Sequence, residues 1–167
     1  MKQRVMLSSG WRYLVWLPLL LMLDQATKYW VQQSLPWLHY VRINAYLNIV
    51  HVHNHGAAFS FLNHPGGWQR WFFTVIALLV MGVLLVWLRR MASRPRYLPV
   101  AVVCTLSGAL GNTLDRVRYG YVIDFIDVHW EGWHWPAFNV ADALICLGVF
   151  LLLWDQAIKM RRAHRIS

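Results

Sequence analysis

Two carboxylates that lie far apart in the sequence carry the chemistry that this chain could perform. Asp124 lies in the apolar stretch Val-Ile-Asp-Phe-Ile, and Asp142 follows Phe-Asn-Val-Ala 18 residues later. Two carboxyl groups that meet in a partly dry site cannot both ionise readily, so one keeps its proton while the other acts as a base. Such a pair can deprotonate water for attack on a peptide carbonyl and protonate the leaving nitrogen.

Both members of this pair have competing interpretations. An acid in the first turns of a helix is stabilised by the helix dipole, so Asp142 could instead serve as a cap. Asp127 competes with Asp124, but it lies farther along the same loop, where a carboxylate is more often solvated. We therefore take Asp124 and Asp142 as the candidate catalytic pair.

Asp24 and Lys28 form a second polar group inside an apolar stretch. Their spacing of four places both on one face of a helix, where they can neutralise each other. Charged side chains within a bilayer are costly and call for an explanation. Either the pair braces the helices, or it orients the reactive groups from behind. We place both residues in a supporting layer.

A stripe of one helix passes from a small residue to an amide to a cation. Gly108, Asn112 and Arg116 recur every four residues, and Ser107 and Gly111 form a small-xxx-small pair. Small residues let another helix approach closely, which explains the glycines. Helix packing explains an amide and a cation on the same stripe less well, so contact with a substrate is the alternative.

Other chemistries find weaker support in the sequence. His51, His53 and His55 would share one face of a strand and could bind a metal, but no Cys or Glu at ligand spacing accompanies them. No Gly-x-Ser-x-Gly stretch occurs, and Ser107 and Cys104 have no histidine at a comparable depth. We expect neither a metal nor another cofactor.

Four apolar stretches are long enough to position these residues inside a membrane. Each contains 18 residues, and two of them carry no charged side chain. In hydrocarbon the backbone must satisfy its own hydrogen bonds, so all four are expected to be helices. The prediction is a single domain of residues 1–167 with transmembrane helices near 13–30, 71–88, 97–114 and 137–154, and outer loops at 31–70 and 115–136.

The distribution of charge gives the orientation. Eleven of the 16 Lys and Arg residues lie in the N-terminus, in residues 89–96 and in the C-terminal tail. The positive-inside rule therefore places both termini in the cytoplasm. Most of the seven acids fall in or beside the opposite half, which indicates chemistry at the outer face. The net charge of +9 suits anionic membrane lipids, and no aromatic-basic face suggests nucleic acid.

Two segments face outward in this arrangement. Residues 40–53 tend to alternate between apolar and polar, which predicts short strands in a small sheet on the membrane surface. Residues 117–136 are rich in Gly and Trp, and we expect them to form a loop along the interface.

Five motifs in this chain together resemble the lipoprotein signal peptidase (signal peptidase II) family. They occur in the family's order and spacing and cover nearly the whole chain. The motifs are Leu23-Asp24-Gln25-Ala26-Thr27-Lys28, Asn54-His55-Gly56-Ala57-Ala58-Phe59-Ser60, Gly108-Ala109-Leu110-Gly111-Asn112 with Asp115-Arg116, Val122-Ile123-Asp124-Phe125, and Phe138-Asn139-Val140-Ala141-Asp142. Any one of them would be weak evidence, but five in register are specific.

The resemblance implies an aspartic endopeptidase of the bacterial inner membrane, with its active site near the periplasmic face beside a small extramembrane sheet. Its substrates would be prolipoproteins carrying a diacylglyceryl-cysteine, cleaved just before that cysteine. On the matching positions Asp124 and Asp142 are catalytic. The resemblance also implies that Asn54, Gly108, Asn112, Arg116 and Asn139 line the substrate site and that Asp24, Lys28 and Asp115 support it.

A small ion or proton-coupled carrier is the alternative to an enzyme. Asp24, Lys28 and Asp142 could then form a relay through the membrane. A carrier needs access from both sides, whereas the inner half of the bundle is almost free of ionisable groups. The sequence therefore favours the enzyme.

Overall fold

The computed structural model describes residues 10–56, 67–91 and 97–164. Residues 57–60 of the second motif lie outside this part, as do the basic residues Lys2, Arg4, Arg94, Arg96 and Arg165. The elements, in chain order, are the 3-10 helix η1 (Gly10–Trp16), α2 (Leu17–Ser34), β1 (Tyr40–Arg42), β2 (Leu47–Asn54), α3 (Trp68–Arg90), α4 (Tyr97–Tyr119), β3 (Val122–Trp130), β4 (Trp133–His134) and α5 (Val140–His164).

Three helices of the described chain are long and apolar enough to cross a membrane. They are Trp68–Arg90, Tyr97–Tyr119 and Val140–Arg162, each of 23 residues. At 1.5 Å per residue such a helix measures about 35 Å, which exceeds a hydrocarbon core of about 30 Å. Three of the four expected spans therefore correspond to helices that are long and apolar enough to cross a membrane. The expected first span begins in η1 and continues into α2, which carries Asp24 and Lys28 and is not among the three.

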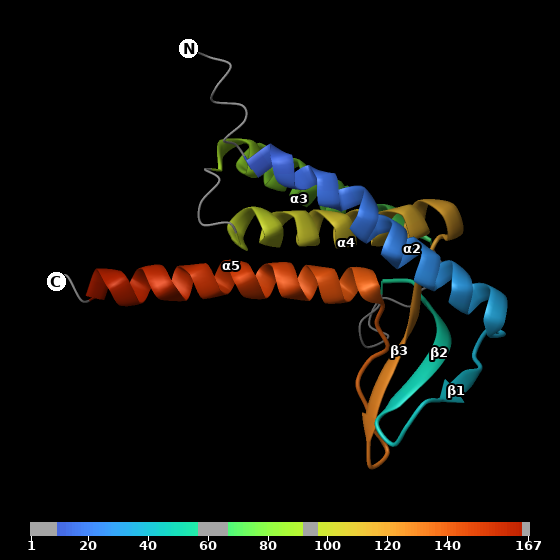
Figure 1. Cartoon of the computed structure of the whole chain (residues 1–167). Coiled ribbons are helices and arrows are strands. Elements are labelled where there is room, and N and C mark those ends of the chain that lie inside the picture. The colour runs from blue at the N-terminus through green and yellow to red at the C-terminus, as the bar shows by residue number, and fades with distance from the viewer. Residues whose placement is uncertain (1–9, 57–66, 92–96, 165–167) are drawn as a thin grey trace.

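Helix α4 is the centre of the bundle. It packs against α5 on one side and against α2 and α3 on the other (Figure 1). Small residues permit the closest of these contacts, because a Cβ atom at Gly108 would collide with the carbonyl oxygen of Ala141 in α5. Helices α3 and α5 expose most of their apolar side chains, as lipid-facing helices do.

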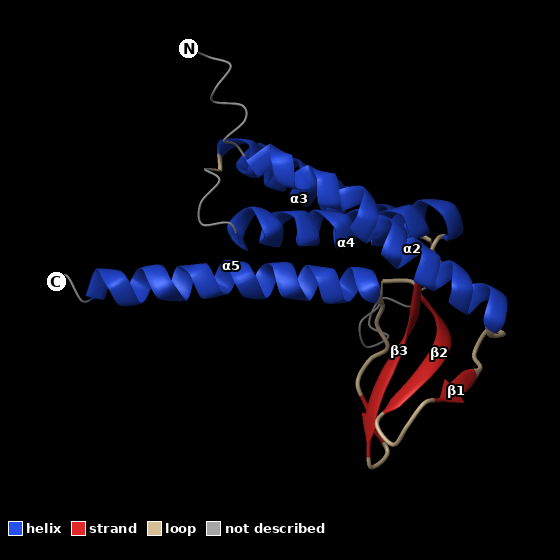
Figure 2. Ribbon diagram, in the orientation of Figure 1, coloured by secondary structure: helices blue, strands red, loops and turns tan. Residues whose placement is uncertain are grey.

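A four-stranded antiparallel sheet is attached to one end of the bundle, which we call the sheet end (Figure 2). The strands β1 and β2 confirm the prediction for residues 40–53. The expectation of a loop over residues 117–136 was wrong, because this segment contains β3 and β4. Its β-branched and aromatic residues suit a strand, and β2 supplies the partner that the local Gly and Trp content does not reveal.

Candidate active site

The N-terminus of α5 begins with a reciprocal pair of hydrogen bonds. The backbone N–H of Asp142 donates to Oδ1 of Asn139 (3.0 Å), and the backbone N–H of Asn139 donates to Oδ2 of Asp142 (3.2 Å). This is a capping box, which satisfies two backbone donors that a helix start leaves unpaired. The other carboxylate oxygen of Asp142 accepts from Nδ2 of Asn112 in α4 (2.7 Å). Asp142 therefore caps its helix and still presents an oxygen to the site.

Asp124 reaches the same place from β3 and is only 2% exposed. One of its carboxylate oxygens accepts from Nδ2 of Asn139 (2.6 Å) and the other from Nδ2 of Asn54 (2.9 Å). Burial, together with the nearby charge of Asp142, raises the pKa of Asp124 to about 7, against the lowering effect of the two asparagine amides. The structure thus brings Asp124 and Asp142 together, with Asn139 in contact with both.

Lys28 joins α2 to α4 next to this pair. Its Nζ lies 3.0 Å from Oδ2 of Asp24 and 2.8 Å from Oδ2 of Asp115, and it donates to Oδ1 of Asn112 (2.9 Å). Asp24 in turn accepts from the backbone N–H of Ala141 at the start of α5 (2.9 Å). All four polar side chains are buried, and together with the backbone of Ala141 they form a polar layer that links α2, α4 and α5.

This layer also sets the orientation of one amide. Because the Lys28 ammonium can only donate, Oδ1 of Asn112 must face it. Nδ2 of Asn112 is then the group that faces Asp142. Lys28 therefore determines, through Asn112, that an amide nitrogen and not an amide oxygen contacts the carboxylate of Asp142.

Gln25 belongs to the same layer, although the sequence analysis did not single it out. Its Nε2 donates to Oδ1 of Asp115 (2.9 Å) and to Oδ2 of Asp24 (3.1 Å). Its position beside Asp24 in the first motif was the available signal. Gln25 was missed because it does not share the i, i+4 spacing that pairs Asp24 with Lys28.

Gly108 and Arg116 of the predicted stripe have different surroundings. Gly108 lies against the backbone of Ala141, where it allows α4 and α5 to touch. The guanidinium of Arg116 lies 5.4 Å from the ring centroid of Phe73, and its buried Nε has no hydrogen-bond partner in the described part of the chain. Contact of either residue with a substrate stays a prediction.

Asp127 does not compete with Asp124 in this geometry. Side chains alternate along a strand, so two residues three positions apart in β3 lie on opposite faces of the sheet. The expectation that Asp127 is solvated was wrong. It is 8% exposed and accepts hydrogen bonds from Asn48 (2.8 Å) and from His134 (2.9 Å).

The three histidines of β2 and the residues after it lie in an aromatic cluster. The ring of His53 stacks between Trp37 and Tyr121, and its Nε2 lies 3.2 Å from Nε2 of His51. Burial, with added repulsion from His51 and His55, lowers the pKa of His53 to about 4. His53 is thus neutral near pH 7.

The fold places this chain in the class of bacterial membrane enzymes. Two solved structures of bacterial membrane enzymes share this architecture. One has a TM-score of 0.78 at 29% identity and covers 87% of each chain. The other has a TM-score of 0.75 at 30% identity and covers 85% of this chain and 90% of its own.

The chain belongs to the signal peptidase II family. The family model described as "Signal peptidase (SPase) II" matches residues 17–158. Lipoprotein signal peptidases from Pseudoalteromonas atlantica and Aeromonas hydrophila are 46% and 47% identical, and the alignments cover 89% of this chain and 90% and 89% of the relatives. The resemblance seen in the five motifs is thereby confirmed, and the protein is a protease.

Proposed function

We propose that this protein is an aspartic endopeptidase that removes the signal peptide from diacylglyceryl-modified bacterial prolipoproteins, cleaving before the lipidated cysteine. One observation carries the catalytic type: Asp124 and Asp142 come from different elements and are linked through Asn139 in a buried site. The substrate class is supported by relatives that are named lipoprotein signal peptidase.

The two acids take different roles in this mechanism. Asp124, whose pKa is raised to about 7, holds the proton. Asp142 is held in place by hydrogen bonds from Nδ2 of Asn112 and from the backbone N–H of Asn139, and we assign it the role of the base. Asp142 removes a proton from water as the oxygen attacks the scissile carbonyl, and Asp124 gives its proton to the leaving nitrogen.

The remaining site residues would hold the substrate. Nε of Arg116 lacks a partner among the described residues and is available to a substrate carbonyl. Asn54, Asn112 and Asn139 surround the two acids with amide groups. Gly108 keeps α5 close to α4, so that Asp142 stands beside Asn112. Asp24, Lys28 and Asp115 support the site from below.

The proposed arrangement in the membrane has four spans in a single domain of residues 1–167, with α2 as the first. Arg89 and Arg90 at the end of α3, and Lys159 and Arg161 near the end of α5, lie opposite the sheet end. The positive-inside rule places that end and both termini in the cytoplasm. The sheet and the acid pair then face the periplasm, where water is available and an apolar signal helix arrives by lateral diffusion in the inner membrane.

Nothing in the described part of the chain favours a carrier. Between the polar layer and the opposite end, the described part of the bundle is filled by an apolar cluster that includes Met81, Leu84 and Leu106. Charged groups would be costly at this depth, so a relay across the membrane has no path there.

The rate of cleavage is expected to fall as pH rises above about 7. Burial raises the pKa of Asp124 to about 7, so its carboxyl group is protonated below that pH. Only this protonated form can give a proton to the leaving nitrogen. The kcat/KM measured in detergent from about pH 5 to about pH 9 should therefore fall on the alkaline side. A rate that instead rises through pH 7 would show that Asp124 acts as the base.

Cleavage is expected to persist in EDTA and to need none of the three histidines near Asn54. The purified protein is incubated with a diacylglyceryl-modified prolipoprotein, and shortening of the substrate is followed with and without EDTA. The triple variant His51→Gln, His53→Gln and His55→Gln should keep substantial activity, because the described contacts of these rings are with one another and with neighbouring aromatic residues such as Tyr121. Loss of activity in EDTA would support a metal bound by the histidines.

A further inference from the structure

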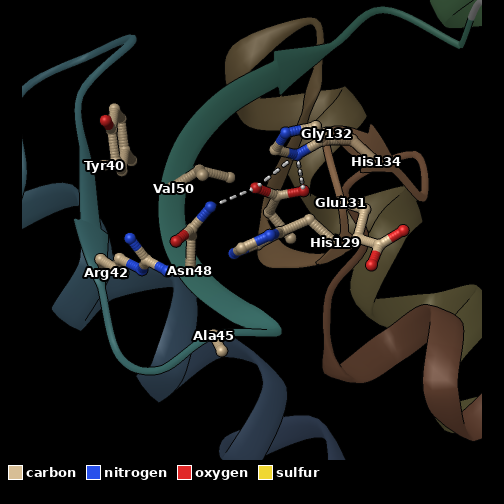
Figure 3. Close-up of a pocket in the computed structure, with 10 residues that line it drawn as sticks. Tyr40, Arg42, Ala45, Asn48, Val50, His129, Glu131, Gly132 and His134 are labelled. Carbon is tan, nitrogen blue, oxygen red and sulfur yellow. Dashed lines mark hydrogen bonds and ion pairs between the residues drawn. The ribbon is translucent and has the colours of Figure 1, made fainter.

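A hollow of about 500 Å³, with both polar and apolar side chains in its lining, lies on the sheet apart from the acid pair (Figure 3). We call it the sheet hollow, and the residues that matter for its chemistry come from all four strands. They are Tyr40, Arg42, Asn48, Asp127, His129 and His134. A volume of this size is within the range of pockets that bind small molecules or short peptides.

The strand register places the sheet hollow on the face opposite Asp124. Arg42 pairs with Asn48, and Asn48 pairs with Asp127, so these three side chains form one row on the same face. Asp124 lies three positions before Asp127 in β3 and projects from the other face. Three residues of strand span about 10 Å, so the two sites are neighbours but distinct.

Two polar atoms of the lining are buried without a partner among the described residues. Asn48 is 6% exposed; its Nδ2 donates to Asp127, while its Oδ1 has no hydrogen-bond partner. Nε2 of His129, whose ring stacks on that of His134, is also buried and unpaired. Leaving such atoms unpaired is costly, so a ligand that offers both a donor and an acceptor would be stabilised here.

The protein backbone is a ligand with these properties. Its N–H groups can donate to Oδ1 of Asn48, and its carbonyl groups can accept from Arg42 and Tyr40. Ala45 and Val50 also line the hollow, but a lipid chain has no donor or acceptor that could pair with Asn48 and His129. The chemistry therefore favours an extended polypeptide.

We infer that the sheet hollow binds the substrate polypeptide in the polar segment that follows the cleavage site; this inference rests on the proposed function. The chain must travel about 10 Å along β3 from the acids and roughly as far again to pass from one face of the sheet to the other. An extended chain covers about 3.3 Å per residue, so the hollow is reached roughly six residues after the cleaved bond.

Two lipid-modified substrates of different length test this inference. The short one ends about three residues after the cysteine, and the long one extends about fifteen residues beyond it. In the variants Asn48→Leu and His129→Phe, KM for the long substrate is expected to rise about three- to tenfold with kcat unchanged, and the short substrate should be unaffected. His39→Phe, a change at an exposed histidine outside the hollow, is the matched control.

The outcomes separate the inference from the function on which it rests. If KM changed equally for the two substrates, or for neither, the sheet hollow would not be a binding site. Cleavage by the wild-type protein would still support the proposed function. Failure of the wild type to cleave either substrate would overturn the proposed function and this inference with it. Arg42→Gln, on the exposed rim, provides the same comparison if Asn48→Leu does not fold.

Discussion

Replacing either Asp124 or Asp142 by asparagine is expected to lower kcat by at least about a thousandfold, because neither amide can exchange a proton with water or with the leaving nitrogen. The substitution keeps the shape of each side chain, so the hydrogen bonds from Asn54 and Asn112 are the contacts most affected. The protein should still insert and fold. Cleavage of a diacylglyceryl-modified prolipoprotein gives kcat, and thermal unfolding in detergent checks the fold.

A buried acid far from the candidate site gives the control for this experiment. Asp155 lies in α5 at the end away from the sheet, where it accepts from the hydroxyl of Tyr97 (2.8 Å) and pairs with Lys159. Asp155→Asn should leave kcat unchanged, whatever it does to stability. If Asp127→Asn abolished turnover and Asp124→Asn did not, the wrong acid of β3 has been assigned to the pair.

The sequence predicted the helices better than the sheet, and the reason is the range of the interactions involved. An apolar stretch of 18 residues predicts a helix in lipid without reference to any partner, and α3, α4 and α5 follow that rule. A strand depends on a neighbour from elsewhere in the chain. The ladder between β2 and β3 joins residues about 70 apart, such as Asn54 and Val122, so the local content of residues 117–136 did not reveal β3.

The candidate site shows the same division between local and distant information. The spacing of Asp24 and Lys28 predicted their ion pair, which the structure contains. The spacing could not predict that Lys28 also binds Asp115 and Asn112, since both contacts depend on how α2 packs against α4. The burial of Asp127 was missed for the same reason, because its partner Asn48 lies across the sheet.

Lys28→Met is expected to lower the free energy of unfolding by about 3–5 kcal/mol, because it leaves the buried carboxylates of Asp24 and Asp115 without their cation. Methionine is close to lysine in length and apolar, so the loss of charge dominates over the loss of packing. Without the ammonium, Oδ1 of Asn112 keeps only the longer contact from Nδ2 of Asn139 (3.3 Å), so the amide can shift away from Asp142. A displacement of this kind should lower kcat by about a hundredfold.

A second substitution separates the charge effect from the amide effect. In Lys28→Met combined with Asp115→Asn, only the carboxylate of Asp24 stays unpaired, and it still accepts from the backbone of Ala141. Thermal unfolding should therefore show that roughly half of the lost stability returns, while kcat stays low because Asn112 still lacks the hydrogen bond from Lys28. If kcat returned together with stability, Lys28 would act on the reaction only by holding the helices in place.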